Sequence, residues 1–125
     1  MSKQRNTPSK NDVRLRIRIL HGSDVALGPG KVELLELVEK TGSITKAAKK
    51  MDMSYMRAWT LIRMMNGCFK EPVVLAARGG KIGGGARLTA TGKAALELYR
   101  QMDRRGLAAV ERHWAGLQKL LRDKK

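Results

Sequence analysis

Hydrophobic and polar residues alternate strictly near the start of the chain. The run V-R-L-R-I-R-I over residues 13–19 places an apolar side chain at every odd position and an arginine at every even position. This period of two predicts a half-buried strand with one basic face. A solvated face that protects a sheet edge would explain the same arginines. The polar residues 1–12 are expected to form a loose tail.

A helical period begins after the turn L-G-P-G at residues 27–30. Pro29 suits the first turn of a helix, because that position needs no backbone N–H donor. Residues 31–41 carry a broad apolar face with three glutamates outside it, and Gly42 is a plausible stop. The pattern therefore predicts a helix that ends at about residue 41.

Two further helices are predicted over residues 44–51 and 55–68. Ser43 and Ser54 can cap their amino ends, and Asp52-Met53 predicts a tight break between them. Alanines at positions 47 and 48 would let another helix approach closely. Two short helices joined by about three residues are typical of a helix-turn-helix.

The helix predicted over residues 55–68 has two different faces at 100° per residue. One face carries Tyr55, Ala58, Ile62, Met65 and Phe69. The opposite face carries Met56, Arg57, Thr60, Arg63 and Met64. Exposed methionines beside arginines suit base edges in a major groove, since guanidinium groups bind guanine and apolar groups contact the thymine methyl. A groove for a partner protein and an ordinary solvated face are the alternatives.

A glycine-rich and basic stretch, R-G-G-K-I-G-G-G-A-R-L-T, occupies residues 78–89. Its glycine-rich part, residues 78–85, lies between the β-prone runs 73–77 and 86–89, which predicts a hairpin with a glycine-rich tip. Glycines let the backbone approach phosphates, and Arg78, Lys81 and Arg87 add charge. The stretch is not a nucleotide-binding loop, because no lysine follows either G-x-x-x-x-G interval and G-x-G-x-x-G does not occur.

A long final helix is predicted from residue 90 to about 122, capped by Thr89 or Thr91. Gly106 and Gly116 could bend or break it. Its apolar positions include Ala95, Leu98, Met102, Ala109, Val110, Trp114, Leu117 and Leu121. A helix this long predicts a homodimer contact, with packing onto the chain's own core as the alternative.

Charge narrows the choice of partner. The net charge is +15 over 125 residues, which favours double-stranded DNA, with an anionic membrane surface second. Residues 44–93 hold ten basic and two acidic residues, so the excess is concentrated over the helix pair and the hairpin. One cysteine and no apolar signal core or membrane-length run predict a cytoplasmic protein without contact to a membrane.

Catalytic and metal-binding patterns are absent from the sequence. His21 and His113 are far apart and have no cysteine or carboxylate at metal-ligand spacing. Cys68 is expected to be a small apolar residue rather than a redox sensor. The glutamates of residues 31–41 form no evident acid–base pair. We therefore expect no enzyme activity, no metal and no cofactor.

These patterns together predict a mainly α fold with a small β component: a winged helix-turn-helix with an N-terminal strand and a long C-terminal dimerisation helix. The expected divisions are a tail over 1–12, a DNA-binding domain over 13–92 and a dimerisation segment over 93–125. The residues predicted to contact DNA are Ser43, Thr45, Lys46, Lys49, Ser54, Tyr55, Met56, Arg57, Thr60, Arg63, Arg78, Lys81 and Arg87.

The predicted function is that of a dimeric, sequence-specific transcriptional regulator with a palindromic operator. A non-specific architectural DNA-binding protein is the main alternative, and a protein-interaction winged helix is a weaker one.

Four segments resemble a known family: G-P-G-K-x-x-L-L-E, T-G-S-I-T-K-A-A, M-S-Y-M-R-A-W and G-G-K-I-G-G-G-A-R-L-T-A-T-G. Over about residues 13–105 they resemble the N-terminal DNA-binding domain of ModE-type molybdate-responsive transcriptional regulators and, more distantly, LysR-type winged helices. The resemblance implies a homodimeric bacterial or archaeal repressor or activator with a wing contact near Lys81. Fuller members carry C-terminal molybdate-binding domains; this chain ends at Lys125, so we do not expect molybdate sensing from it, and the effector is unknown.

Overall fold

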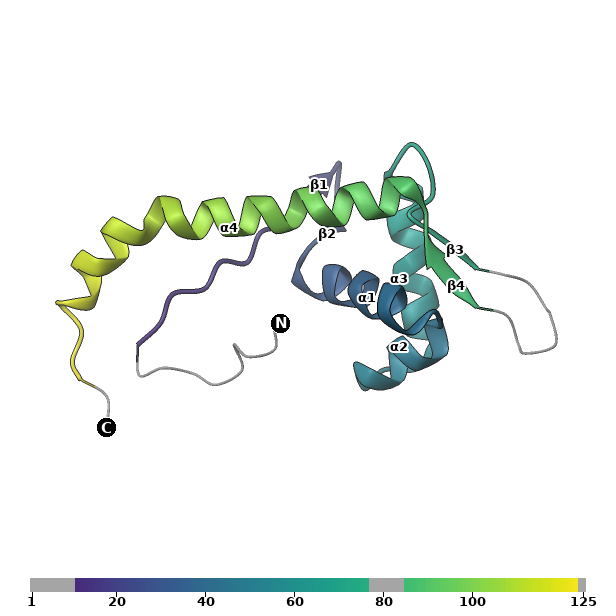
Figure 1. Ribbon diagram of the computed structural model, residues 1–125, viewed down its shortest axis with the longest axis horizontal. Helices are drawn as coiled ribbons and strands as arrows, with labels where there is room; N and C mark the ends of the chain where they lie inside the picture. The colour runs from purple at the N-terminus through teal and green to yellow at the C-terminus, as the bar shows by residue number, and fades with distance from the viewer. Residues whose placement is uncertain (1–10, 77–84, 124–125) are drawn as a thin grey trace. The chain divides into compact units, whose positions relative to one another are not determined.

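The computed structural model describes residues 11–76 and 85–123, which form two compact units. The first unit is Arg16–Arg100, and the second combines the described parts of Met1–Leu15 and Gln101–Lys125. The elements in chain order are β1 (Ile19–His21), β2 (Asp24–Leu27), α1 (Pro29–Thr41), α2 (Ile44–Lys50), α3 (Tyr55–Cys68), β3 (Val74–Ala76), β4 (Ala86–Leu88) and α4 (Ala90–Gln118) (Figure 1).

The amino-terminal segment pairs over fewer residues than its alternation predicts. Exposure does alternate through residues 11–20, but the paired strand covers only Ile19–His21. Its antiparallel partner is β2, which follows the turn at Gly22 and Ser23 and which we did not predict. The prediction of a strand over residues 13–19 was wrong in extent. Alternation describes exposure along an extended chain, whereas a strand also needs a neighbour with which to form hydrogen bonds.

Both ends of α1 lie where the sequence predicts them. Pro29 occupies the first turn, and Gly42 follows the last residue with a φ of 71°. The Gly42 N–H donates to the carbonyl oxygen of Val38 at 2.8 Å. A left-handed residue at this position closes the helix, and glycine adopts that conformation without steric cost.

The helix-turn-helix consists of α2 and α3, which follow α1 in a compact group (Figure 1). Ala47 and Ala48, the alanines predicted to let another helix approach closely, are 0% and 2% exposed, and Ala58 of α3 is also buried. Ile62 and Met65 continue the buried side of α3, whereas Tyr55 is 47% exposed. The core around these helices is Leu27, Val32, Leu34, Leu35, Val38, Ile44, Ala47, Ala48, Ala58, Ile62, Met65, Val73, Val74, Ala86, Leu88, Leu96 and Tyr99.

A β-hairpin follows α3 and leads into α4. Strands β3 and β4 are antiparallel, with Val74 opposite Leu88 and Ala76 opposite Ala86 (Figure 1). The predicted hairpin is confirmed, although β3 begins at Val74 rather than Val73. The glycine-rich tip lies outside the described residues. Helix-turn-helix, hairpin and trailing helix make the winged helix-turn-helix that the sequence predicts.

Helix α4 is continuous through Gly106 and Gly116, which settles whether these glycines break it. Thr89 caps it, since its Oγ1 accepts from the N–H of Gly92 at 2.9 Å. The helix ends at Gln118, four residues before the predicted end.

The residues that α4 buries differ from the predicted apolar set. Its buried residues are Gly92, Leu96 and Tyr99, and the Tyr99 hydroxyl donates to the carbonyl oxygen of Ile17 at 2.7 Å. Leu98, which the apolar spacing included, is 61% exposed. In the second unit, Leu15 lies against Gly106, where a Cβ would come within 2.7 Å of a Leu15 methyl carbon.

Candidate nucleic-acid interface

The outward face of α3 has the composition that the sequence predicts. Met56 and Met64 are 64% and 41% exposed, and the three polar residues of this face are also exposed. These five residues, which we call the reading face, are Met56, Arg57, Thr60, Arg63 and Met64. Exposed methionines are unusual on a surface that contacts only water, because thioether side chains gain from burial. The face is therefore suited to contact with a partner.

Two serines fix the starts of α2 and α3. The Oγ of Ser43 accepts from the N–H of Lys46, and the Oγ of Ser54 accepts from the N–H of Arg57, both at 3.0 Å. Each hydroxyl satisfies one of the free N–H groups at a helix start. Ser54 therefore fixes the turn from which Arg57 projects, and both predicted caps are confirmed.

Removal of the Ser54 cap should lower stability measurably. Ser54→Ala is expected to reduce the free energy of unfolding by about 1 kcal/mol, because the Arg57 N–H loses its acceptor. Thermal unfolding followed by circular dichroism measures the change. Ser23→Ala, an exposed serine in the turn between β1 and β2, is the matched control and should change stability by less than about 0.5 kcal/mol. Equal losses in the two variants would contradict a capping role for Ser54.

The turn between α2 and α3 contains a left-handed residue. Asp52 has a φ of 58°, and the following Met53 N–H donates to the carbonyl oxygen of Ala48 at 3.0 Å. Asp and Asn adopt this conformation more readily than other non-glycine residues. The predicted tight break is thus confirmed, and it sets the angle at which α3 leaves α2.

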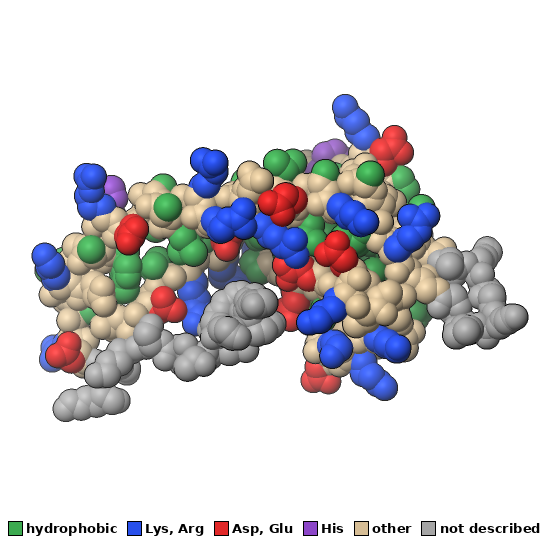
Figure 2. All heavy atoms as spheres, in the orientation of Figure 1, with side chains coloured by type: hydrophobic (Ala, Val, Ile, Leu, Met, Phe, Trp, Pro, Cys, Tyr) green, Lys and Arg blue, Asp and Glu red, His purple; other side chains and the backbone are tan. Residues whose placement is uncertain are grey.

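Basic side chains gather on α2. Thr45, Lys46 and Lys49 are exposed, as is Lys50 in the last turn. Figure 2 shows several lysine and arginine side chains at the lower right, around the place where Figure 1 shows α2. The acidic face of α1 is partly neutralised, because Glu36 forms an ion pair with Arg100 at 3.2 Å. Helices α2 and α3 themselves carry five basic residues and no acidic residue.

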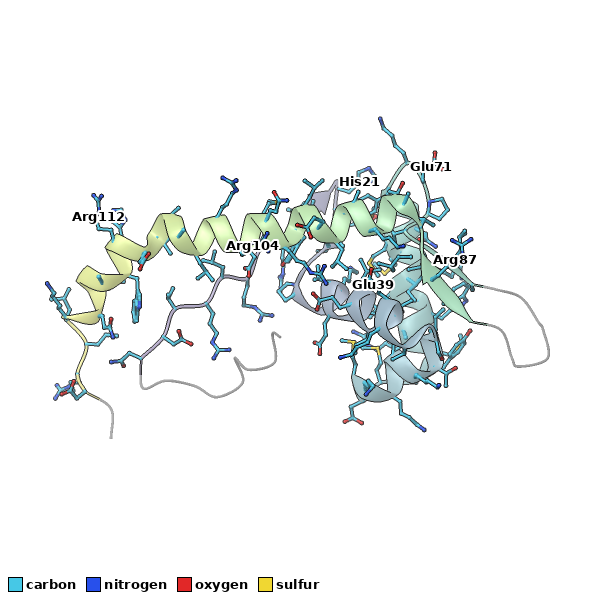
Figure 3. All side chains as sticks on the ribbon, viewed as in Figure 1. His21, Glu39, Glu71, Arg87, Arg104 and Arg112 are labelled. Atoms are coloured by element: carbon cyan, nitrogen blue, oxygen red, sulfur yellow. The ribbon has the colours of Figure 1, made fainter. Side chains whose placement is uncertain are left out.

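The hairpin supplies one described basic side chain. Arg87 is exposed on β4, opposite Leu75, and Figure 3 shows it extending outward beside the hairpin. The predicted contacts Arg78 and Lys81 lie outside the described residues. The described part of the hairpin therefore consists of the paired strands β3 and β4, with Arg87 exposed on β4.

Sequence reasoning missed the residues that attach the hairpin to the helices. Asn66 of α3 forms three side-chain hydrogen bonds with Val73 and Val74. The N–H of Ala86 donates to the carbonyl oxygen of Gly42 at 3.0 Å, and the Oγ1 of Thr89 donates to that of Pro72 at 2.7 Å. These bonds join residues that are not helical neighbours, so no periodicity in the sequence indicates them.

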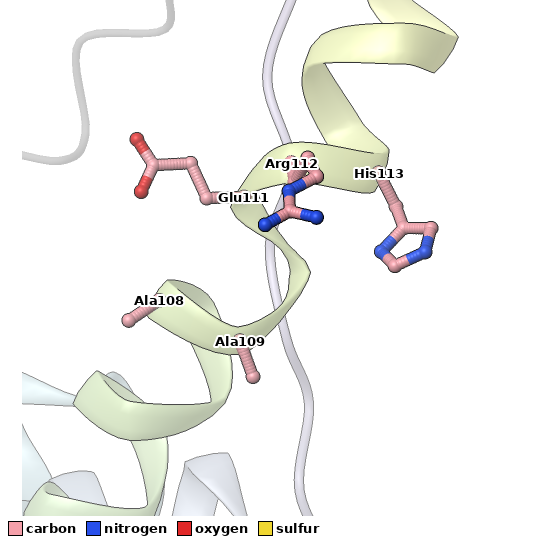
Figure 4. Close-up of a pocket in the computed structure, with 5 residues that line it drawn as sticks. All are labelled: Ala108, Ala109, Glu111, Arg112 and His113. Carbon is pink, nitrogen blue, oxygen red and sulfur yellow. The ribbon is translucent and has the colours of Figure 1, made fainter.

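A surface hollow lies beside the second half of α4. Its lining residues are Ala108, Ala109, Glu111, Arg112 and His113 (Figure 4). All five are exposed and come from one helix. Such a hollow lacks the enclosing apolar walls of a small-molecule site.

Metal sites and membrane-spanning helices have no candidate among the described residues. Residues 11–76 and 85–123 contain no group of three or more His, Cys, Asp or Glu side chains that could hold a metal ion. Among the helices of the same residues, none is long and apolar enough to cross a membrane. The reading face and the basic residues near it remain the strongest candidate for a functional surface.

Comparison with known proteins identifies similar chains. No protein-family model matches. The molybdenum transport protein ModE of Azotobacter vinelandii is 39% identical over 87 residues, 70% of this chain and 32% of the relative. The molybdenum-pterin-binding protein MopB of Rhodobacter capsulatus is 39% identical over 103 residues, 82% of this chain and 34% of the relative. The DNA-binding transcriptional dual regulator ModE of Escherichia coli K12 is 41% identical over 71 residues, 57% of this chain and 27% of the relative.

This chain thus spans about a third of the length of the curated relatives that it matches. The similarity is nevertheless consistent across them, at 39% to 41% identity. Over the matched stretch, the chain resembles the ModE-type transcriptional regulators, as its sequence motifs predict.

Proposed function

We propose that this chain is a sequence-specific DNA-binding transcriptional regulator that binds a palindromic operator as a homodimer. The observation that carries the proposal is the reading face, a set of exposed methionines, arginines and a threonine on the second helix of a helix-turn-helix. Relatives of this chain are named transcriptional regulators, one of them DNA-binding, which supports the same conclusion.

The reading face would supply the base contacts. Arginine donates two hydrogen bonds to O6 and N7 of guanine, and a threonine or methionine side chain contacts the thymine methyl group. An α-helix fits into the major groove of B-DNA, where these groups are displayed. Arg57 and Thr60 lie in the first half of α3, where recognition helices place their base contacts.

Positive charge beside the reading face would bind the phosphates. Lys46 and Lys49 lie on α2, the first helix of the helix-turn-helix, and Ser43, Thr45, Ser54 and Tyr55 offer hydroxyl groups at the starts of α2 and α3. Arg87 on the hairpin, with Arg78 and Lys81 of the tip, would lie along the backbone or in the minor groove. Such contacts fix register and carry no direct sequence information.

Two single substitutions separate these two roles. Arg57→Ala should lower affinity for the cognate duplex by about 1–3 kcal/mol and relax the base preference at its contact. Lys46→Ala should weaken all duplexes alike and reduce the slope of log affinity against log salt by about 1. Fluorescence anisotropy titrations with a selected duplex and a random duplex at several salt concentrations measure both effects. If Arg57→Ala weakens both duplexes equally, Arg57 does not read bases.

The long helix offers a surface for the proposed dimer. Val110, Trp114 and Leu117 follow one another at spacings of four and three residues, which places them on one side of α4. Leu117 is 55% exposed, and Met102 is 45% exposed. A second copy would cover this apolar surface and would give the complex the two-fold symmetry that a palindromic operator mirrors.

Light scattering coupled to size exclusion tests the dimer. The expected mass is twice the 13.9 kDa of one chain at micromolar concentration. Leu117→Lys should shift the mass toward that of one chain, because it places a charge in an apolar contact. Lys119→Ala, which changes an exposed position in the turn after α4, is the control and should leave the mass unchanged. A mass of one chain for the unmodified protein would contradict the dimer and leave the DNA contacts standing.

The regulated genes are proposed to belong to molybdenum metabolism. This step rests on the relatives, whose names refer to molybdenum transport and molybdenum–pterin binding. Genome-wide mapping of the DNA bound by this chain should recover sites upstream of molybdate-transport genes. Recovery of sites elsewhere only would overturn this assignment.

A further inference from the structure

The side chain of Asn66 binds the backbone of the hairpin's first strand. Its Oδ1 accepts from the N–H of Val73 at 2.8 Å and from the N–H of Val74 at 3.2 Å. Its Nδ2 donates to the carbonyl oxygen of Val74 at 3.2 Å. One amide side chain from the last turns of α3 thus uses both its donor and its acceptor on β3.

These bonds take the place of a neighbouring strand. The Thr89 N–H donates to the carbonyl oxygen of Val73, so the carbonyl group of Val73 is bonded toward the β4 side, whereas its N–H is bonded to Asn66. In an antiparallel pair the next residue directs its N–H and C=O away from the partner, and for Val74 that side is occupied by Asn66. Val73 and Val74 are 0% and 2% exposed, so water cannot readily replace these bonds.

The second strand has its own attachment. The N–H of Ala86 donates to the carbonyl oxygen of Gly42, in the corner between α1 and α2. A Cβ at Gly85 would come within 3.0 Å of the same oxygen, so the chain passes close to this corner. The hairpin is therefore held at both strands, by α3 through Asn66 and by the α1–α2 corner through Ala86.

We propose that Asn66 is a positioning residue that sets the hairpin relative to the reading face, so that both engage one DNA duplex together. Asn66 is on the same helix as Arg63, one turn further along. A shift of β3 along Asn66 would move its partner strand β4, and with it Arg87, relative to the bases that α3 is proposed to contact. The inference rests on the proposed DNA-binding function.

A residue that only stabilised the fold would act differently. Its loss would lower stability and weaken every DNA contact in the same proportion. Loss of a positioning residue changes how much the hairpin adds to the DNA-binding free energy when α3 is also bound. Non-additivity between substitutions is the signature of such coupling.

A double-mutant cycle on DNA affinity tests the proposal. Arg87→Ala should weaken DNA binding about 5-fold in the unmodified protein. In the Asn66→Ala background it should weaken binding less than about 2-fold, because the hairpin is no longer placed to contact the DNA phosphates. Lys46→Ala, on α2, is the matched control and should have the same effect in both backgrounds. Additive effects for Arg87→Ala and Asn66→Ala would overturn the proposal.

A measurement without DNA tests the hydrogen bonds alone. In Asn66→Ala, hydrogen exchange at the amides of Val73 and Val74 should accelerate at least about 10-fold, while amides of residues 32–38 in α1 should be unaffected. Unchanged exchange at Val73 and Val74 would overturn the attachment. If Asn66→Ala does not fold, Asn66→Leu replaces it in both experiments, since its side chain has a similar size and offers neither the acceptor nor the donor.

The proposed function and the positioning role fail separately. If Arg57→Ala, Arg87→Ala and Lys46→Ala all leave DNA affinity unchanged, the proposed function is wrong. If each of them weakens binding but the cycle with Asn66 is additive, only the positioning role is wrong.

Discussion

Replacement of Gly92 by alanine should destabilise the protein by about 3 kcal/mol, although alanine is the better helix former. A Cβ at Gly92 would overlap the carbonyl oxygen of Val73 and come within 3.0 Å of its carbonyl carbon. The obstacle is backbone rather than a flexible side chain, so α4 and the hairpin must separate. Val73 is fully buried, and its carbonyl oxygen accepts from the N–H of Thr89, which that separation would disturb.

The chain offers a matched control on the same helix. A Cβ added at Gly116 would meet no heavy atom within 4 Å, so Gly116→Ala should be neutral or stabilise the protein by up to about 1 kcal/mol. Chemical unfolding of both variants gives the comparison. Equal changes in the two variants would show that the close contact between α4 and Val73 does not exist.

Two leucines on α4 should respond very differently to the same substitution. Leu96→Ala is expected to cost about 2–5 kcal/mol, because Leu96 is 1% exposed and its removal leaves a cavity in the core. Leu98→Ala should change stability by less than about 0.5 kcal/mol, because Leu98 is 61% exposed. Thermal unfolding in dilute solution measures both, since dilution limits any contribution from association through α4.

Similar losses for the two leucines would contradict the orientation of α4. A larger loss for Leu98→Ala would mean that the apolar spacing in the sequence, rather than the structure, identifies the buried side. The comparison also bears on the dimer. If the loss at Leu98 appears only at high protein concentration, Leu98 lies in the contact between two copies.

Local signals predicted the helices of the first unit well. The proline at position 29, the glycine at position 42 and the serines at positions 43 and 54 set helix ends through bonds within one or two turns. Buried positions such as Ala58 and Ile62 follow from helical periodicity in the same way. These features depend on neighbours three or four residues away, so the sequence displays them directly.

Features that depend on distant partners were predicted less well. The alternation over residues 13–19 correctly indicated alternating exposure, but it did not identify β2 as the partner of β1. Leu96 and Leu98 both fit a broad apolar face, and the approach of the core decides which is buried. Asn66 bonds to residues seven and eight positions later, where no pattern of apolar and polar residues marks the contact.

In the candidate interface, too, the features that depend on the local sequence were predicted correctly. The composition of the reading face follows from periodicity, and all five of its residues are exposed as predicted. The hairpin strands were predicted from β-prone runs on either side of a glycine-rich stretch, and the pairing is confirmed. The role of these residues in DNA binding stays a prediction.

One titration tests the central claim most directly. A duplex selected by this chain from a random pool is compared with unselected duplex in anisotropy titrations at several salt concentrations. A sequence-specific regulator should prefer the selected duplex by at least about 10³-fold, and the preference should survive as salt weakens both complexes. A ratio near one at every salt concentration would contradict base reading by α3 and would leave a non-specific DNA-binding protein whose affinity derives from its net charge of +15.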